Sequence, residues 1–279
     1  MKVKVLLFVS ILNAQMLFAQ ESVLIPPKPK DADRREVPLP YLREANMMWS
    51  KRVWRVIDLE EKMNLPLKFP VFKSSQERKN LMEVIYDALR EGAITAYGYE
   101  DDEFTKVITL KEVESRGGAR IDSVQIPSPD PPYDMIDTAI ISGFDPDKVV
   151  AYRVKEDWYF DEQRSVMEVR IIGIAPLVLM TDEKGNVREG NIRIPLFWIY
   201  FPDARKVLAQ HEVFNRGNGA ARMTYADFFQ KRFFGSYIVK EDNVYDRRII
   251  DYTQGMNALL ESERIKEEIT NFEHDMWEF

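Results

Sequence analysis

The residue types that most often carry catalysis are few in this sequence and lie far apart. Among 279 residues there are two histidines, His211 and His274, and no cysteine. Neither histidine belongs to a His-Glu-x-x-His motif, which places two zinc ligands and a general base on one helical face. A Ser-His-Asp arrangement in space stays open, yet the chain lacks the Gly-x-Ser-x-Gly turn that exposes the nucleophile in many hydrolases. We therefore expect no catalytic, metal-binding or cofactor-binding residues.

Two other stretches invite a chemical interpretation. Residues 100–103 read Glu-Asp-Asp-Glu but lack both the ligand spacing and the turn glycine of a calcium loop, so we interpret them as a solvated loop. Residues 216–219 read Arg-Gly-Asn-Gly and lack the lysine of a phosphate-binding loop. With 46 acidic residues, some pair always looks suitable for glycoside hydrolysis, so a carboxylate-dependent hydrolase is kept as an alternative.

The composition is that of a folded protein with an ordinary solvated surface. Hydrophobic residues make up 45%, aromatic residues 12% and charged residues 30%, which is enough apolar material for a sizeable core. The net charge is −7, and phosphate neutralisation needs a basic face. A general nucleic-acid binder is therefore not expected.

The N-terminus has the pattern of a secretory signal over residues 1–19. Lys2 and Lys4 precede a mostly apolar stretch at residues 5–18, and Ala19 offers a small residue before a cut at Gln20. Removing two lysines shifts the net charge from −7 to −9. The absence of cysteine excludes disulfides and a thiol-linked lipid anchor. We expect an exported, unanchored protein of a bacterial periplasm.

The N-terminal half is predicted to be helical after an extended start. Residues 20–40 are rich in proline and charge and form an extended leader. Apolar residues at three-and-four spacing predict a helix over residues 41–64, and a second helix is predicted over 74–92, capped by Ser74 with Glu77 and stopped by Gly92. A short helix from Leu110 completes a helical subdomain at residues 41–125. The proline-rich stretch at 126–132 is expected to be a linker.

The middle of the chain is predicted to be an antiparallel sheet. Apolar and charged residues alternate at 167–171, a preceding strand lies around 152–160, and strands near 177–180 and 192–194 bracket a hairpin turn at 182–186. The apolar run at 196–201 predicts a central strand covered on both faces. With helices before and after this sheet, the fold class is α+β, and residues 133–279 form one region.

Residues 224–279 are predicted to return to helix and to carry the densest group of aromatic and basic residues. Thr224 and Asp227 cap a short helix that ends at Gly235, and a long helix starts near Gly255, with a buried stripe from Ala258 to Met276. Aromatic residues and arginine are the usual anchors of protein interfaces. The candidate partner-binding residues are Trp54, Phe228, Phe229, Arg232, Phe233, Phe234 and Tyr237.

Three sequence blocks together resemble a known family. They are residues 48–59, which begin Met-Trp-Ser-Lys-Arg-Val-Trp, residues 197–208, which begin Phe-Trp-Ile-Tyr-Phe-Pro, and residues 228–277. These blocks resemble the GldN/PorN family of gliding-motility and type IX secretion proteins from Bacteroidetes, over essentially the whole mature chain.

The resemblance implies a periplasmic, non-enzymatic structural subunit of the type IX secretion machine. The implied partner is a GldK/PorK-type outer-membrane lipoprotein, with which the protein self-associates into a ring under the outer membrane, near a GldM/PorM-type motor component. Contact with the membrane would then run through the partner alone. A secreted carbohydrate-binding module, using exposed tryptophans, is a further alternative.

Overall fold

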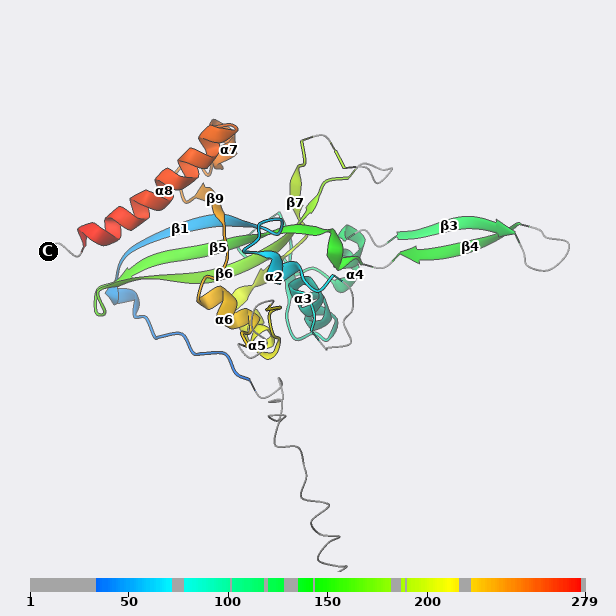
Figure 1. The fold of residues 1–279 in the computed structure, drawn as a ribbon, viewed down its shortest axis with the longest axis horizontal. Helices are drawn as coiled ribbons and strands as arrows, with labels where there is room; N and C mark the ends of the chain where they lie inside the picture. Colours follow the sequence, from blue (N-terminus) through cyan, green and yellow to red (C-terminus); the bar gives the residue numbers. More distant parts are fainter. Residues whose placement is uncertain are drawn as a thin grey trace, which may run out of the picture. The chain divides into compact units, whose positions relative to one another are not determined.

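The computed structural model describes residues 34–71, 78–100, 102–117, 120–127, 135–142, 144–181, 187–188, 190–215 and 222–276 (Figure 1). The predicted signal peptide, most of the leader and the predicted turn at 182–186 lie outside these residues. Within residues 120–127 and 135–142 only the backbone is described.

A seven-stranded sheet forms the centre of the described fold, and all its pairings are antiparallel. Its spatial order is β2-β8-β6-β5-β1-β9, and β7 also pairs with β6. The strands are β1 (Met47–Asp58), β2 (Ala96–Tyr97), β5 (Val149–Asp161), β6 (Val166–Leu179), β7 (Arg193–Pro195), β8 (Trp198–Tyr200) and β9 (Tyr237–Glu241). A separate hairpin joins β3 (Arg120–Pro127) to β4 (Met135–Ser142), and β3 includes the first two residues of the predicted linker at 126–132.

Helices lie between β1 and β5 and after β6, and the sheet is antiparallel, so the structure confirms the α+β class. The helices are α2 (Leu65–Lys68), α3 (Leu81–Arg90), α4 (Leu110–Arg116), α5 (Phe201–Gln210), α6 (Tyr225–Gln230), α7 (Ile249–Tyr252) and α8 (Met256–Asp275). Short 3₁₀ turns occur at Glu44–Asn46 and Pro146–Lys148.

The predicted helix over residues 41–64 is wrong, because the middle 12 residues of this range form strand β1. Trp54 and Val56 face one side of the sheet, whereas Val53 and Ile57 face the other, and all four are buried. A strand that is buried on both faces loses the simple alternation of apolar and polar residues. Its apolar positions then match helical spacing by chance, although β-branched and aromatic residues favour a strand.

The other N-terminal helices largely follow their sequence signals. α3 buries Leu81, Val84, Ile85 and Ala88, as predicted, and Gly92 beyond it has a φ of 72°. Its capping box is made by Asn80 and Glu83, whereas the predicted caps Ser74 and Glu77 lie outside the described residues. α4 begins at Leu110 with Thr109 as its cap.

The predicted strand at residues 196–201 is shorter than expected. Only Trp198–Tyr200 form β8, and Phe201 begins helix α5. Pro202 explains the change, since proline is favoured in the first helical turn, where its missing N–H would have no intrahelical partner. Helix α5 then buries Ala204 and Leu208 against the sheet, in a region that was predicted to be β.

The C-terminal helices agree with prediction except at one end. The Thr224–Asp227 capping box is present, and α8 buries Ser262, Ile265 and Ile269 on the predicted stripe. However, α6 ends at Gln230 rather than at Gly235, and Arg232 in the following turn has a φ of 55°. Gly235 instead permits a close approach of the chain to Glu61, because an added Cβ would lie 2.4 Å from Glu61 Oε2.

Two hydrophobic clusters cover one face of the sheet. The larger packs α3, α5 and α6 on the sheet and includes Leu81 and Phe197 from both sides of residues 126–132. The smaller holds α8 against β1 and β9 through Val53, Ile238 and Ile265. Both clusters therefore depend on the same central strands. The subdomain division at residues 126–132 stays a prediction.

Candidate protein-interaction surface

The aromatic residues expected at an interface lie mostly inside the molecule. Phe228, Phe229 and Phe234 are buried. The ring centroids of Phe228 and Phe229 are 5.9 Å apart in an edge-to-face arrangement, and those of Phe229 and Phe234 are 5.8 Å apart with tilted rings. Phe229 also meets Phe201 of α5 at 5.6 Å. These side chains fix α6 to α5. Among these phenylalanines, Phe233 has an exposed side chain, at 44%.

The two expected interface residues on strands are partly or fully enclosed. Trp54 on β1 is 7% exposed, and its indole Nε1 donates a hydrogen bond to Asp102. Tyr237 on β9 is half-buried, and its hydroxyl accepts a hydrogen bond from Arg193 at 3.4 Å. The structure thus gives both residues internal contacts, and their assignment to a partner interface stays a prediction.

Arg232 is held by a buried carboxylate. Its guanidinium donates two hydrogen bonds to Glu156 of β5, at 2.9 and 3.1 Å, and Glu156 has no exposed side-chain surface. The rings of Trp158 and Phe234 lie 5.3 and 5.1 Å from the Arg232 Cζ atom. Arg55 approaches the same carboxylate at 4.0 Å, and burial lowers the pKa of Arg55 while Glu156 opposes that effect. Arg232 therefore joins the α6 turn to the sheet.

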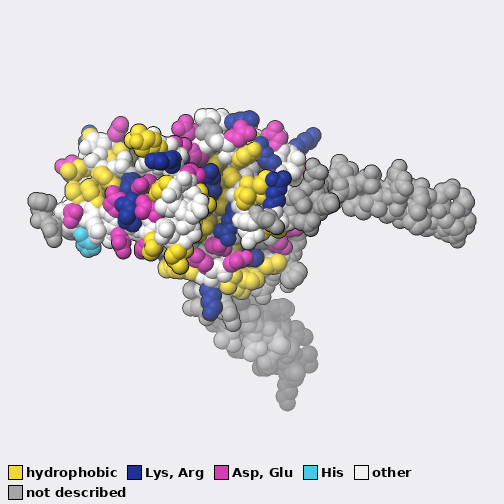
Figure 2. Space-filling view, turned by 90° about the horizontal axis from the view of Figure 1, so that it is seen from above, with side chains coloured by type: hydrophobic (Ala, Val, Ile, Leu, Met, Phe, Trp, Pro, Cys, Tyr) yellow, Lys and Arg dark blue, Asp and Glu magenta, His cyan; other side chains and the backbone are white. Residues whose placement is uncertain are grey.

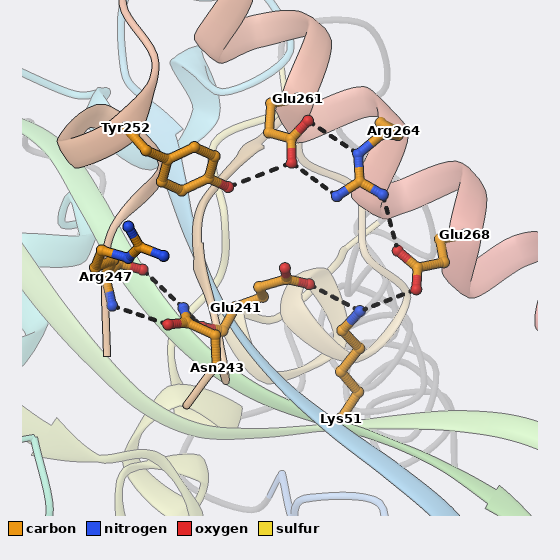
Figure 3. Close-up of polar contacts among 8 residues, drawn as sticks. All are labelled: Lys51, Glu241, Asn243, Arg247, Tyr252, Glu261, Arg264 and Glu268. Atoms are coloured by element: carbon orange, nitrogen blue, oxygen red, sulfur yellow. Dashed lines mark hydrogen bonds and ion pairs between the residues drawn. The ribbon is translucent and has the colours of Figure 1, made fainter. Parts of the chain in front are cut away.

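Polar contacts join α8 to the strands beside it (Figure 3). Lys51 of β1 pairs with Glu241 of β9 at 2.8 Å and lies 3.8 Å from Glu268 of α8. The Ser262 hydroxyl accepts a hydrogen bond from the Ile238 amide at 2.8 Å, which satisfies a donor on the outer side of β9. The Trp49 and Phe272 rings stack at 4.6 Å. These contacts place α8 over the β1–β9 edge.

A second set of polar contacts orders α7 and the surface of α8 (Figure 3). Arg264 donates hydrogen bonds to Glu261 at 2.7 and 2.9 Å and to Glu268 at 3.3 Å. The Arg264 hydrogen bonds lower the pKa of Glu261. The Tyr252 hydroxyl donates to Glu261 at 3.3 Å, and burial raises the pKa of Tyr252. The start of α8 is thereby tied to α7.

Exposed apolar side chains gather in the same part of the chain. Figure 2 shows acidic and basic side chains intermixed on one face of the molecule, with groups of hydrophobic side chains among them. Seven large hydrophobic residues with exposed side chains lie within 17 residues of sequence, and we call them the C-terminal apolar surface. They are Val244, Tyr245, Ile250, Tyr252, Met256, Leu259 and Leu260.

Arg247 connects the aromatic members of this surface. Its guanidinium lies 4.4 Å from the centre of the Tyr245 ring and 6.0 Å from that of Tyr252. Asn243 fixes the loop, because its side chain accepts from the Arg247 amide at 3.0 Å and donates to the Arg247 carbonyl at 2.8 Å (Figure 3). An ordered arginine between exposed tyrosines matches the composition of interface hot spots.

The sequence prediction missed these seven residues. The signal was present in α8, where Met256, Leu259 and Leu260 lie off the stripe that runs from Ala258 through Ile265. Large apolar residues outside the buried stripe of an amphipathic helix have no internal partner to explain them. The many phenylalanines at residues 228–234 favour an interface by sequence, but most of them pack in the core.

Searches for other kinds of site give no positive result in the part of the chain that the structure describes. No group of three or more His, Asp or Glu side chains there could hold a metal ion. The acidic loop has one role that the sequence did not reveal, since Asp102 contacts Trp54 and Lys155. No described helix is both long enough and apolar enough to cross a bilayer.

The described chain is thus an α+β protein whose exposed C-terminal surface has the composition of a protein-binding site. A family model described as gliding motility associated protein GldN matches residues 42–278, and the chain belongs to this family. Membership associates it with gliding motility and type IX secretion, in a family of structural components rather than a known enzyme family. A search of curated proteins found no match.

Proposed function

We propose that the protein is a non-enzymatic structural subunit of the type IX secretion and gliding-motility machine, located in the periplasm at the inner face of the outer membrane. Family membership over residues 42–278 supports the association with this machine. The C-terminal apolar surface is the single structural observation that supports a scaffold role, since it offers aromatic, methionine and leucine side chains to a partner.

The partner assigned to this surface is a GldK/PorK-type outer-membrane lipoprotein. Tyr245, Arg247 and Tyr252 supply anchors of the type that dominates binding energy, and Met256, Leu259 and Leu260 extend the apolar area. Asn243 and the Arg264–Glu261 pair hold this surface in place before binding, which reduces the entropy that association must overcome. The surface is therefore preorganised for a protein partner.

Ring formation needs a second contact between neighbouring subunits. A ring closes when a head-to-tail contact repeats with a rotation that divides a full turn. Such a contact uses two different surfaces on each subunit, so the subunit–subunit contact is separate from the lipoprotein contact. A GldM/PorM-type motor component would bind the assembled ring.

The test is the double variant Leu259→Asp/Leu260→Asp, compared with Phe233→Asp. Both changes place charge on exposed apolar positions, but Phe233 follows α6 and lies outside the C-terminal apolar surface. We expect the double variant to lose co-purification with the lipoprotein at least tenfold while its melting temperature stays within a few degrees, because exposed positions contribute little to folding. Phe233→Asp should bind normally.

If Phe233→Asp loses binding and the double variant keeps it, the lipoprotein contact belongs to the α6 turn. Equal binding by both variants and the unmodified protein would remove the C-terminal apolar surface from the proposal. Ring particles in electron micrographs of the co-purified complex test the assembly itself. A protein that stays monomeric and binds no envelope protein contradicts the scaffold function.

A further inference from the structure

A polar cavity of about 680 Å³ lies on the sheet face opposite α8. β1 and β5 form its floor with alternate residues, and Val239 and Lys240 of β9 line one side. The loop that carries Asp102 lines another side. This cavity shares no residue with the C-terminal apolar surface, and the proposed scaffold function does not use it.

Most cations in the cavity wall have an acidic partner. Arg52 donates to both carboxylate oxygens of Asp157, at 2.6 and 2.8 Å. The remaining pairs are Lys155 with Asp102 at 3.3 Å, Lys240 with Asp246 at 2.5 Å and Arg248 with Asp251 at 3.6 Å. Within each pair the two charges neutralise each other, and the pairs hold the side chains of the cavity wall in place.

Arg153 is the exception. Its cross-strand neighbours are Val56 on β1 and Ala175 on β6, so neither neighbour can offer a carboxylate. Its Nε is sealed from solvent without a hydrogen-bond partner, and Asp102, the acid whose charge acts on it, already pairs with Lys155. Burial lowers the pKa of Arg153, the positive charge of Arg248 lowers it further, and the charge of Asp102 opposes both effects.

An unpaired guanidinium in such a place is costly. Its Nε is the atom that is out of contact with water, and buried polar groups in proteins nearly always find a partner. The planar guanidinium presents two parallel donors that match the two oxygens of a carboxylate. The missing partner of Arg153 is therefore an anion that enters the cavity.

We propose that the cavity binds a single carboxylate group, with the guanidinium of Arg153 as its anchor. The described lining holds six acidic residues and five cations, so a polyanion would be repelled, and the place for a single negative charge is beside Arg153, the one cation of this lining without an acidic partner of its own. Trp54 forms a rigid wall, since its ring lies 4.3 Å from Lys240 Nζ and 5.6 Å from Lys155 Nζ. The carboxylate belongs either to a free small acid or to the C-terminus of a peptide.

The test compares binding of defined probes to the full chain and to two variants. The probes are acetate, a pentapeptide with a free C-terminal carboxylate, and the same pentapeptide with an amidated C-terminus. Arg153→Met removes the anchor. Arg193→Met is the matched control, because Arg193 carries its own partner, Asp58, at 2.6 Å and does not line the cavity. Calorimetry measures each affinity.

We expect Arg153→Met to weaken binding roughly tenfold to a hundredfold, the range for a lost hydrogen bond to a charged group, while Arg193→Met stays within about twofold. Binding of both acetate and the free-acid peptide identifies the carboxylate alone as the ligand. Binding of the free-acid peptide but not of acetate identifies a peptide C-terminus. The amidated peptide should not bind in either case.

A spectroscopic measurement on the unmodified protein guards against misfolding of the variant. The Nε–H resonance of Arg153 should shift on saturation with the binding probe, because this group gains an ionic neighbour. Failure of acetate and the free-acid peptide to bind saturably, or equal binding by Arg153→Met and unmodified protein, overturns the proposal. Either result is independent of whether the protein binds a lipoprotein.

Discussion

Gly173 allows a loop to pack on the sheet. An added Cβ at this position of β6 would lie 2.4 Å from Cζ of Phe104, inside any normal contact distance. The Phe104 ring also meets Tyr97 edge to face at 5.5 Å and Trp198 at 6.2 Å. Phe104 has a φ of 60°, an uncommon backbone conformation for a bulky residue that the surrounding packing must maintain. The glycine and the strained phenylalanine therefore depend on each other.

Gly173→Ala should lower the free energy of unfolding by about 1–3 kcal/mol, the usual cost of an overpacked site. Gly98→Ala is the control, since the nearest atom to its added Cβ would be Lys106 Cδ at 3.7 Å. Urea denaturation measures both. Combining Gly173→Ala with Phe104→Ala should cost less than the sum of the single changes, because the clash disappears with the ring. Additive costs would show that the two residues do not interact.

Arg232→Met should destabilise the fold by about 3–5 kcal/mol, because it removes the two short contacts to the buried carboxylate of Glu156 and leaves only the longer ones from Arg55 and Trp158. Arg264→Met removes an exposed pair instead and should cost under about 1 kcal/mol. Thermal unfolding distinguishes them. Adding Glu156→Gln to Arg232→Met should restore part of the loss. If Arg232→Met unfolds no earlier than Arg264→Met, the Glu156 contact does not stabilise the fold.

At the scale of elements, α8 is attached more locally than the other long helices. Its buried residues Ile265 and Ile269 belong to the small cluster with Val53 and Ile238, whereas α3, α5 and α6 share the large one. Elements with few buried apolar contacts open with lower free energy than the whole protein. We infer that α8 is a separate opening unit on an otherwise cooperative sheet.

Trp49→Ala should therefore speed hydrogen exchange in α8 selectively. The change removes the stacking partner of Phe272, a contact worth about 0.5–1.5 kcal/mol in addition to the buried area. Amides of residues 256–275 should lose protection while those of β5 keep theirs. Leu208→Ala, in the large cluster, should instead lower protection throughout the sheet. Uniform loss after Trp49→Ala would show that α8 and the sheet open together.

The Glu261–Arg264 pair gives α8 a dependence on pH. Because Arg264 lowers the pKa of Glu261 below its ordinary value near 4.5, the pair stabilises the helix above that pH and stops doing so as pH falls through the lowered pKa. The contribution is a few tenths of a kcal/mol, as for other exposed pairs on one helix. In Arg264→Gln the titration midpoint of the Glu261 carboxyl, followed by NMR, should rise. An unchanged midpoint would rule out the contact in solution.

Sequence patterns predicted elements with one polar face and missed those enclosed on both sides. Alternation identified β5 and β6, the Thr224–Asp227 cap identified α6, and the apolar stripe from Ala258 identified α8. β1 was taken for a helix because its run from Val53 to Ile57 is buried on both faces. Helix α5 was missed because the apolar residues before Pro202 hid the point where strand gives way to helix.

At the scale of the whole molecule, the interaction residues could not be separated from core residues by type alone. Phe228, Phe229 and Arg232 have the chemistry of interface anchors, yet their contacts are with α5, Phe234 and Glu156. Arg153 could not have been identified either, because its lack of a partner depends on which residues the sheet register places beside it. Register joins distant segments, and local sequence carries little information about it.

The contact between Asn64 and Gly235 joins the beginning of the described fold to its end. Asn64 is fully buried, and its side chain accepts from the Gly235 amide and donates to the Gly235 carbonyl, both at 2.9 Å, across 171 residues of sequence. In the same way β1, near the start of the fold, has β9, near its end, as its outer neighbour. Contacts this distant in sequence form slowly. During synthesis, β1 must therefore wait for nearly the whole chain, and a product truncated before Tyr237 would expose its outer edge to aggregation.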